Sequence, residues 1–328
     1  LLKPFIENRV VMPSIIHVAV AVIVNDKGDV CISLRHDNTH QGGLWEFPGG
    51  KIEKHEAAQQ ALIREIKEEL DLEVNDSRPL IKVVHDYNDR KVCLHVHRVL
   101  SYSGHAQGVE GQKIEWVAVD QLSTYDFPQA NLPIIKAVQL PERYLISGKF
   151  SDQDDFLKKL KSALDNGIKL VQLRLKNIKL NSDEVSSLID KSSALCAQVN
   201  AKLLLNISKE HLRSIDLSIV AFDGYHADSH MLDKLSRRPE GILFSASCHN
   251  QDQLQKARQL GADFVVLSPV KKTASHPETE PMGWQKFSDL VDGCAMPVYA
   301  LGGVSVEDME SAWSHGAQGV AAISAFWH

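Results

Sequence analysis

The sequence lacks most of the features that mark special classes of protein. Its five cysteines are spread along the chain and form no C-x-x-C pair, which argues against a disulfide framework and against a structural zinc site. No run of 18 or more apolar residues occurs, so we expect no membrane span. Lys and Arg number 36 against 42 Asp and Glu, so the sequence has no basic excess that would favour binding a nucleic-acid polymer.

The start of the chain has no recognisable targeting signal. LLKPFIENRVV has neither the basic-then-apolar order of a signal peptide nor its cleavage site. We therefore expect a cytoplasmic protein, with residues 1–13 as an N-terminal extension. At 328 residues the chain is about twice the usual single-domain length, so two domains are expected. The sequence does not set the oligomeric state.

Residues 14–140 have the pattern of a mixed α+β domain. HVAVAVIV, NDKGD and VCISLR read as strand, turn and strand. A helix rich in glutamate follows, then four further β-rich runs and the short helix NLPIIKAVQL. The histidines of HVH, His95 and His97, alternate on one of these strands, and we interpret them as packing and hydrogen-bonding residues and not as metal ligands.

Residues 141–328 alternate between short apolar runs and helical stretches. Eight runs are present, from RYLISG near the start to GVAAISAF near the end. Several of the helical stretches open on Asp or Ser and close on Gly, which is typical of helix caps. Eight β-then-α units predict an α/β fold, a (β/α)8 TIM barrel. An open doubly wound sheet is the alternative.

The helix in WEFPGGKIEKHEAAQQALIREIKEEL, residues 45–70, concentrates negative charge. Glu65, Glu68 and Glu69 stand at i, i+3 and i+4, so their side chains fall within one 100° arc. Like charges at this spacing destabilise a helix, and a divalent cation would neutralise them. Oxygen ligands indicate Mg²⁺ or Mn²⁺. The alternative is a solvated acidic face.

The same stretch resembles the Nudix box of the nucleoside-diphosphate-linked-X hydrolases. The match runs from Gly50 through Glu56 and Arg64 to Leu72, and departs from it at Asp71, where the family has glycine. Asp tolerates the left-handed conformation needed there better than most residues. The resemblance implies an α+β Nudix fold with a mixed sheet that carries the Nudix helix.

The resemblance also implies roles for the Nudix-box residues. It makes Gly50, Glu65, Glu68 and Glu69 the metal-binding positions, with Glu65 activating the attacking water. Arg64 would orient Glu65 and Glu56 through charge-assisted hydrogen bonds. The catalytic set is thus expected to be Glu56, Arg64, Glu65 and Glu69.

Three segments resemble the MutT-type 8-oxo-dGTP diphosphatases more narrowly. They are LWEFPGGKIE, EGQ at 110–112 and DFPQAN at 126–131. By this resemblance Asn131 binds the oxidised guanine and Glu110 reaches the metal site from a loop. The other implied nucleotide-binding residues are Arg35, Phe47, Arg90 and Phe127. A helix N-cap is the alternative role for Asn131.

Residues 143–326 resemble the thiamine phosphate synthase and thiazole tautomerase superfamily. VQLRLK, ASCHN, GADFVVLSPVKKT, PVYALGGV and GAQGVAAISAF carry the likeness. The resemblance implies a phosphate site at Gly302, Gly303 and Ser324, although a tight turn would also explain the glycines. It also implies ligand-binding roles for Gln172, Arg174, Lys176, Asn206 and His249, the last as in the tautomerase branch.

The synthase pattern is incomplete, however. Asn206 is followed by Ile207 instead of aspartate, and the segment from Thr273 to His276 lacks the family's lysine. Without magnesium ligands a pyrophosphate leaving group would lose its charge neutralisation. We therefore expect a barrel of degenerate synthase type that binds a thiamine-type phosphate.

These patterns support three hypotheses for the whole chain. The first is a Mg²⁺-dependent hydrolase that cleaves 8-oxo-dGTP to the monophosphate and pyrophosphate and so keeps the nucleotide pool clean. The second gives the hydrolase a thiamine-related pyrophosphate and the barrel a thiamine precursor phosphate. The third makes the barrel a ligand sensor or scaffold without chemistry of its own.

Overall fold

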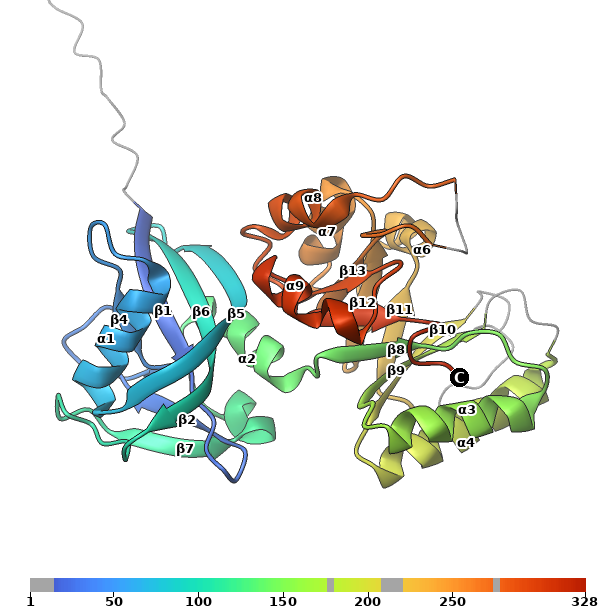
Figure 1. Ribbon diagram of the computed structural model, residues 1–328, viewed down its shortest axis with the longest axis horizontal. Coiled ribbons are helices and arrows are strands. Elements are labelled where there is room, and N and C mark those ends of the chain that lie inside the picture. Colours follow the sequence, from blue (N-terminus) through green and yellow to red (C-terminus); the bar gives the residue numbers. More distant parts are fainter. Residues whose placement is uncertain (1–14, 176–179, 208–220, 274–277) are drawn as a thin grey trace, which may run out of the picture.

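The computed structural model describes residues 15–175, 180–207, 221–273 and 278–328. Two parts lie side by side, a sheet-rich N-terminal part and a barrel (Figure 1). The expected extension at residues 1–13 lies outside the described residues. No helix among the described residues is both long and apolar enough to cross a membrane.

Two sheets and one long helix build the N-terminal part. The four-stranded sheet has the order β4-β1-β6-β5, and the three-stranded sheet has the order β3-β2-β7. The strands are β1 (Ile15–Val22), β2 (Asp29–Leu34), β3 (Trp45–Glu46), β4 (Gly49–Lys51), β5 (Glu73–Asp86), β6 (Lys91–Ser103) and β7 (Ile114–Ala118). The helical elements are α1 (Ala58–Leu70), η1 (Val119–Thr124), η2 (Gln129–Asn131) and α2 (Leu132–Gln139).

The central strand β1 pairs parallel to β6 and antiparallel to β4. Side chains of β1 contribute alternately to two apolar clusters, because successive residues of a strand point to opposite faces of the sheet. Ala19 and Ala21 pack with α1, whereas Val20 and Val22 pack with α2 on the other face. The expected mixed α+β domain is therefore confirmed.

The C-terminal part is a closed barrel in the order β10-β11-β12-β13-β14-β15-β8-β9. All eight expected strands are present: β8 (Arg143–Ile146), β9 (Leu170–Leu175), β10 (Lys202–Ile207), β11 (Gly224–Ala227), β12 (Leu243–Cys248), β13 (Phe264–Leu267), β14 (Val298–Leu301) and β15 (Gly319–Ala322). Every neighbouring pair is parallel. Closure excludes the open doubly wound sheet.

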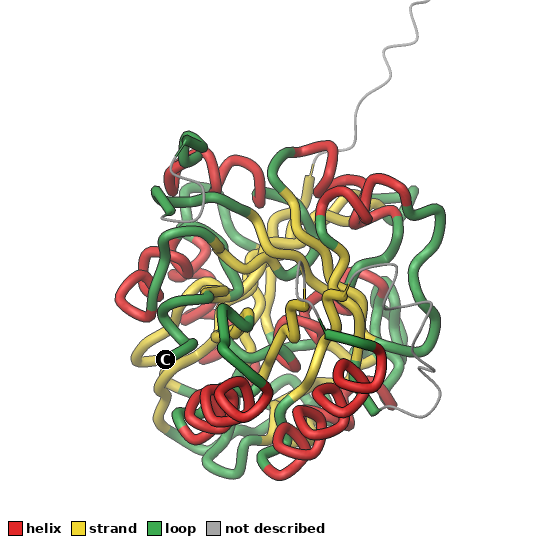
Figure 2. Tube along the Cα trace, turned by 90° about the vertical axis from the view of Figure 1, so that its right-hand side faces the viewer, coloured by secondary structure: helices red, strands yellow, loops and turns green. Residues whose placement is uncertain are grey.

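Helices surround the barrel strands, as the view from the barrel side shows (Figure 2). The described helices are α3 (Gln153–Asp165), α4 (Ser182–Gln198), α6 (Ser229–Lys234), α7 (Gln251–Gln259), α8 (Gly283–Val291), η3 (Val306–Asp308) and α9 (Met309–Ser314). The expected caps are present at α3, where the Asp152 carboxylate accepts a hydrogen bond from the Asp155 N–H, and at α7, where Asn250 caps in the same way. Such caps stabilise a helix by about 1 kcal/mol each.

The two parts meet where α2 runs into β8. The Arg78 guanidinium is buried there, paired with Glu142 and stacked over the Trp313 ring at 4.1 Å. Lys82 pairs with Asp292 at 2.7 Å and Lys136 with Asp263 at 2.8 Å. Charged contacts therefore hold the β5 and α2 side of the first part against the barrel.

Candidate active site and barrel ligand site

Helix α1 carries the predicted glutamates and ends where the sequence departs from the Nudix box. Asp71 adopts the left-handed conformation, with φ 55° and ψ 31°, and its N–H still donates to the Lys67 carbonyl. Its carboxylate pairs with Lys67 Nζ at 2.5 Å. Asp71 thus supplies the turn for which the family uses glycine, as the sequence predicted.

Arg64 links three carboxylates, those of Glu56, Glu65 and Glu68, into one acidic cluster. Its guanidinium donates to both Glu56 oxygens at 3.0 and 2.9 Å, to Glu65 Oε1 at 2.7 Å and to Glu68 Oε2 at 3.2 Å. It also donates to the Lys51 carbonyl at 3.1 Å. A planar fork that reaches three carboxylates fixes where each one points.

Glu69 is the most strongly perturbed carboxyl of the cluster. Burial and the charges of Glu46, Glu110 and Glu65 raise its pKa to about 8, although the Gly49 N–H donates to its carboxylate at 3.1 Å. Several carboxylates with too little positive charge between them form a donor set that a divalent cation would stabilise. The residues therefore fit Mg²⁺ or Mn²⁺.

The glycine turn before α1 leaves room for this cluster. A side chain at Gly50 would collide with the Glu65 carboxylate, and one at Gly49, whose φ is 147°, would collide with the Ala19 carbonyl. Glu110 lies exposed on the loop between β6 and β7. The structure thus places Glu65 and Glu69 against the Gly49–Gly50 turn, and the Glu110 charge acts on Glu69, whereas Glu68 is exposed and pairs with Arg64.

Two of the predicted nucleotide-binding residues form an aromatic pair. The Phe47 and Phe127 rings stack with their centroids 5.5 Å apart, and both are buried. Asn131, also buried, follows Phe127 on η2. Asn131 occupies the N-cap position of α2, but its side chain makes no capping hydrogen bond.

The two predicted arginines have different surroundings. Arg35 pairs with Glu46 and donates twice to the His40 carbonyl. Arg90 is more exposed and pairs with its neighbour Asp89 at 3.0 Å. Arg35 therefore lies among fixed partners, whereas Arg90 lies on the turn between β5 and β6.

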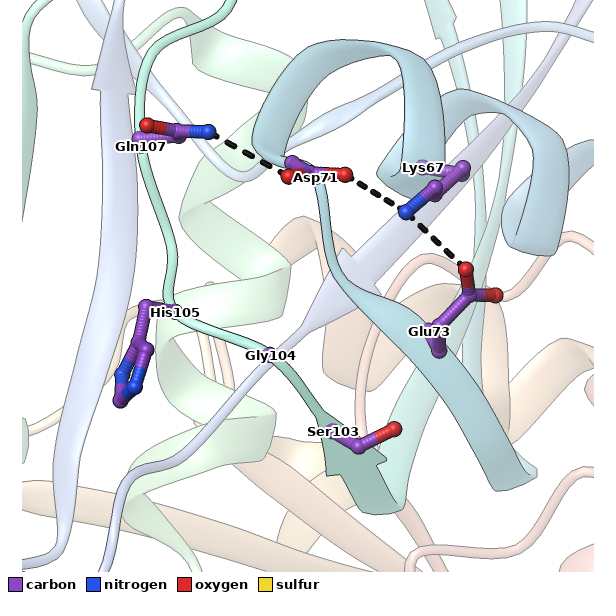
Figure 3. Close-up of a pocket in the computed structure, with 7 residues that line it drawn as sticks. All are labelled: Lys67, Asp71, Glu73, Ser103, Gly104, His105 and Gln107. Atoms are coloured by element: carbon purple, nitrogen blue, oxygen red, sulfur yellow. Dashed lines mark hydrogen bonds and ion pairs between the residues drawn. The ribbon is translucent and has the colours of Figure 1, made fainter.

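A separate hollow of about 480 Å³ lies beside the end of α1 (Figure 3). Lys67 bridges Asp71 and Glu73 there, and Gln107 donates to Asp71 at 3.3 Å. These side chains hold one another and include none of the predicted site residues. The hollow is therefore not the candidate active site.

Inside the barrel, a chain of hydrogen-bonded polar groups crosses the apolar interior. The Asn206 amide donates to Gln172 Oε1 at 2.8 Å, and Gln172 donates in turn to the Tyr144 hydroxyl at 3.1 Å. His226 lies 3.2 Å from the same hydroxyl and within 2.9 Å of the Ser245 hydroxyl. All five residues are buried, and buried polar groups linked in this way fix one another's orientation.

The remaining barrel positions lie at its mouth. Gly302 and Gly303 have φ of 97° and 66°, and Pro269 and the Lys271–Lys272 segment approach them so closely that a side chain would not fit. The His249 ring lies 2.8 Å from the Ser268 carbonyl oxygen. Arg174 and Ser324 are exposed. Lys176 lies outside the described residues, as do residues 274–276 of the segment that lacks the family's lysine.

The close packing of this turn thus explains Gly302 and Gly303 without a phosphate, which is the alternative given in the sequence analysis. Sequence reasoning missed Tyr144, His226 and Ser245, although each is a polar residue within an apolar barrel strand. That placement was the available signal, because buried polar side chains need partners. It also missed Glu46, whose charge contributes to the raised pKa of Glu69.

Fold and sites together define a two-domain chain, with an acidic hydrolase-like centre followed by a polar-lined TIM barrel. Comparison with known families agrees: a NUDIX domain matches residues 19–137 and thiamine monophosphate synthase matches residues 143–326. The chain belongs to the Nudix family through its first domain and to the thiamine monophosphate synthase family through its second.

Relatives of both domains match this chain over nearly their whole length. The 8-oxo-dGTP diphosphatase of Escherichia coli is 35% identical over 120 residues, which are 37% of this chain and 93% of that protein. A provisionally named thiamine-phosphate synthase 2 of Aquifex aeolicus is 32% identical over 192 residues, 58% of this chain and 99% of that protein. A solved MutT structure, from work on Aliivibrio salmonicida and Vibrio cholerae, is 35% identical with a TM-score of 0.35 and covers 38% of this chain and 97% of its own.

Proposed function

We propose that the first domain, residues 14–140, hydrolyses 8-oxo-dGTP to the monophosphate and pyrophosphate with Mg²⁺. The observation that carries this proposal is the buried Asn131, whose side chain makes no capping bond and which lies four residues after Phe127 of the Phe47–Phe127 stack. An amide offers a donor and an acceptor to a purine edge, and a stacked aromatic pair suits a flat base. The similarity to the E. coli 8-oxo-dGTP diphosphatase supports the same substrate.

The acidic cluster supplies the chemistry in this proposal. Mg²⁺ would supply charge neutralisation on the diphosphate and activation of water. Glu65, Glu68, Glu69 and Glu110, with the Gly50 backbone, would hold the ion. Glu65 would accept the proton of the attacking water, and Arg64 keeps Glu65 and Glu56 in position through the bonds described above. Arg35 and Arg90 would contact the nucleotide.

The test is pyrophosphate release from 8-oxo-dGTP, dGTP, CTP and thiamine pyrophosphate by the full chain with Mg²⁺. We expect a clear preference for 8-oxo-dGTP. In the Asn131→Ala variant this preference over dGTP should fall by roughly 10- to 100-fold, because one bidentate contact to a base contributes about 1–3 kcal/mol. Asn75→Ala, at an exposed position of β5, is the matched control. An unchanged ratio in the Asn131 variant would remove base recognition from Asn131.

For the barrel, residues 141–328, we propose that it binds a thiamine precursor phosphate without synthase activity. The Gln172–Asn206 pair and the His226 imidazole offer neutral donors and acceptors suited to an uncharged ring. Arg174, Gly302, Gly303 and Ser324 would hold the phosphate at the mouth, and Lys176, which lies outside the described residues, stays a predicted ligand.

The second candidate function makes the two domains act on related compounds. Their fusion in one chain favours it, since the barrel belongs to the thiamine monophosphate synthase family. Faster pyrophosphate release from thiamine pyrophosphate than from 8-oxo-dGTP would establish this function instead. A thiazole tautomerisation assay on wild type and His249→Ala separates a catalytic barrel, in which the variant loses activity, from a sensor, in which neither protein is active.

A further inference from the structure

A cluster of metal-ligating side chains lies outside the acidic centre, on the four-stranded sheet. His17 and Cys93 are direct partners in the parallel pairing of β1 with β6. His95 is two residues after Cys93, and therefore projects from the same face of the sheet. Among the described residues, these three form the one group of histidine, cysteine or carboxylate side chains whose ligand atoms all lie within 4.8 Å of one another.

The distances match those of a tetrahedral zinc site. Zn–N bonds of about 2.05 Å and Zn–S bonds of about 2.3 Å place two nitrogens about 3.3 Å apart and a nitrogen about 3.6 Å from sulfur. His17 Nδ1 lies 3.0 Å from His95 Nε2, and Cys93 Sγ lies 3.5 Å from the same nitrogen. The remaining pair, Cys93 Sγ and His17 Nδ1, lies within 4.8 Å, so a movement of about 1 Å completes the geometry.

The chemical state of these groups suits a soft or borderline metal ion. Burial, together with the charges of Lys82, His17 and His97, lowers the pKa of His95 to about 4. The ring is therefore neutral at pH 7, with a nitrogen lone pair available. Burial raises the pKa of the Cys93 thiol, and zinc displaces such a proton when it binds.

The positive charge of Lys82 acts on both Cys93 and His95. It is paired with Asp292 at 2.7 Å, and the Asp292 charge acts on the same two groups in the opposite sense. Asp292 therefore offsets part of the Lys82 charge at the cluster. Asp292 follows α8 of the barrel, so the cluster lies beside the contact between the domains.

We propose that His17, Cys93 and His95 bind one Zn²⁺ through two imidazole nitrogens and one thiolate. His17 is exposed, which gives the ion an entry path and leaves the fourth position to water. The site differs from the acidic centre in its ligands, because nitrogen and sulfur select zinc whereas oxygen selects magnesium. The ion cross-links β1 to β6 at the edge of the domain contact.

The test is a titration of the reduced, metal-free full chain with Co²⁺ in excess Mg²⁺, which occupies the oxygen ligands of the acidic centre. Wild type should show a thiolate-to-cobalt charge-transfer band in the near ultraviolet, saturating at one ion per chain. Adding Zn²⁺ should bleach this band with the same stoichiometry. Absence of the band at saturating Co²⁺ would overturn the proposal and leave a hydrogen-bonded histidine pair.

Variants assign the band to its ligands. Cys93→Ser should abolish it, and His17→Gln, a surface change that the fold tolerates, should weaken Co²⁺ binding by roughly a hundredfold. Cys294→Ser in the barrel and the exposed His105→Gln are matched controls and should keep both band and affinity. Unaltered Co²⁺ binding by His17→Gln, or loss of the band in Cys294→Ser, would place the ion elsewhere and refute the site. Circular dichroism establishes that each variant is folded.

Discussion

Replacing Glu69 by glutamine should inactivate the hydrolase and also make the metal-free protein more stable. The carboxyl has a pKa of about 8 in the fold against 4.5 in the unfolded chain. Each pH unit of that difference corresponds to about 1.4 kcal/mol. The 3.5 units between these values therefore set a ceiling of about 5 kcal/mol on what the ionised Glu69 costs the fold.

The pH dependence follows from the direction of this shift. The folded state holds the proton more tightly than the unfolded state, so raising the pH from 4.5 towards 8 removes stability from wild type. Below pH 4.5 both states are protonated and the effect vanishes. Glutamine cannot ionise and keeps an oxygen for the Gly49 N–H. The variant should thus match wild type near pH 4.5 and exceed it by about 3 kcal/mol at pH 7.

The assay is thermal unfolding of wild type and Glu69→Gln in a chelator, from pH 5 to pH 8. A gain of about 3 kcal/mol would raise the first-domain transition by roughly 10 °C at pH 7. Mg²⁺ should then stabilise wild type far more than the variant. Glu68→Gln is the control, because Glu68 is 57% exposed and its loss should change stability by less than about 1 kcal/mol. A Glu69 variant that gains nothing between pH 5 and pH 8 would refute the charge-crowding argument.

Three further outcomes are expected. Arg64→Met should lower kcat/KM by about 100-fold or more, as measured by steady-state kinetics. Arg64→Lys should recover little of this activity, because an ammonium cannot bridge Glu56 and Glu65 at once. Arg78→Met should destabilise the domain contact by about 1–2 kcal/mol, because it removes the ion pair with the partly exposed Glu142 and the stacking over the Trp313 ring. Unfolding that separates into two transitions would report it. Asn206→Leu should weaken binding of thiamine phosphate to the barrel at least 10-fold by calorimetry, because it leaves Gln172 without its donor.

Much of this architecture could be predicted from local patterns in the sequence. The glutamate spacing of α1 and its end at Asp71 depend only on neighbouring residues, and both predictions are confirmed. The eight barrel strands could also be predicted, because a strand buried on both sides is a continuous apolar run. Asn131 was ambiguous, since a capping residue and a buried ligand residue look the same until the side chain's partner is known.

The predictions failed where contacts join distant segments. His226 was not selected, because its partners Tyr144 and Ser245 become neighbours only when the barrel closes. The same holds for His17 and His95, which are 78 positions apart and meet across β1 and β6. His95 was interpreted as a packing residue because its neighbours on β6 were all the sequence could show.

Strand pairing explains why such sites cannot be recognised from sequence motifs. A helix places residues i, i+3 and i+4 together whatever the rest of the chain does, so the acidic cluster of Glu65, Glu68 and Glu69 is visible in one short segment. A parallel pair such as β1 and β6 needs a long crossover, and its register depends on packing of the whole sheet. Shifting β6 by one residue would turn Cys93 and His95 to the opposite face and separate them from His17. The zinc proposal therefore depends on the observed register, and the weaker cobalt binding expected of His17→Gln tests that register as directly as it tests the metal.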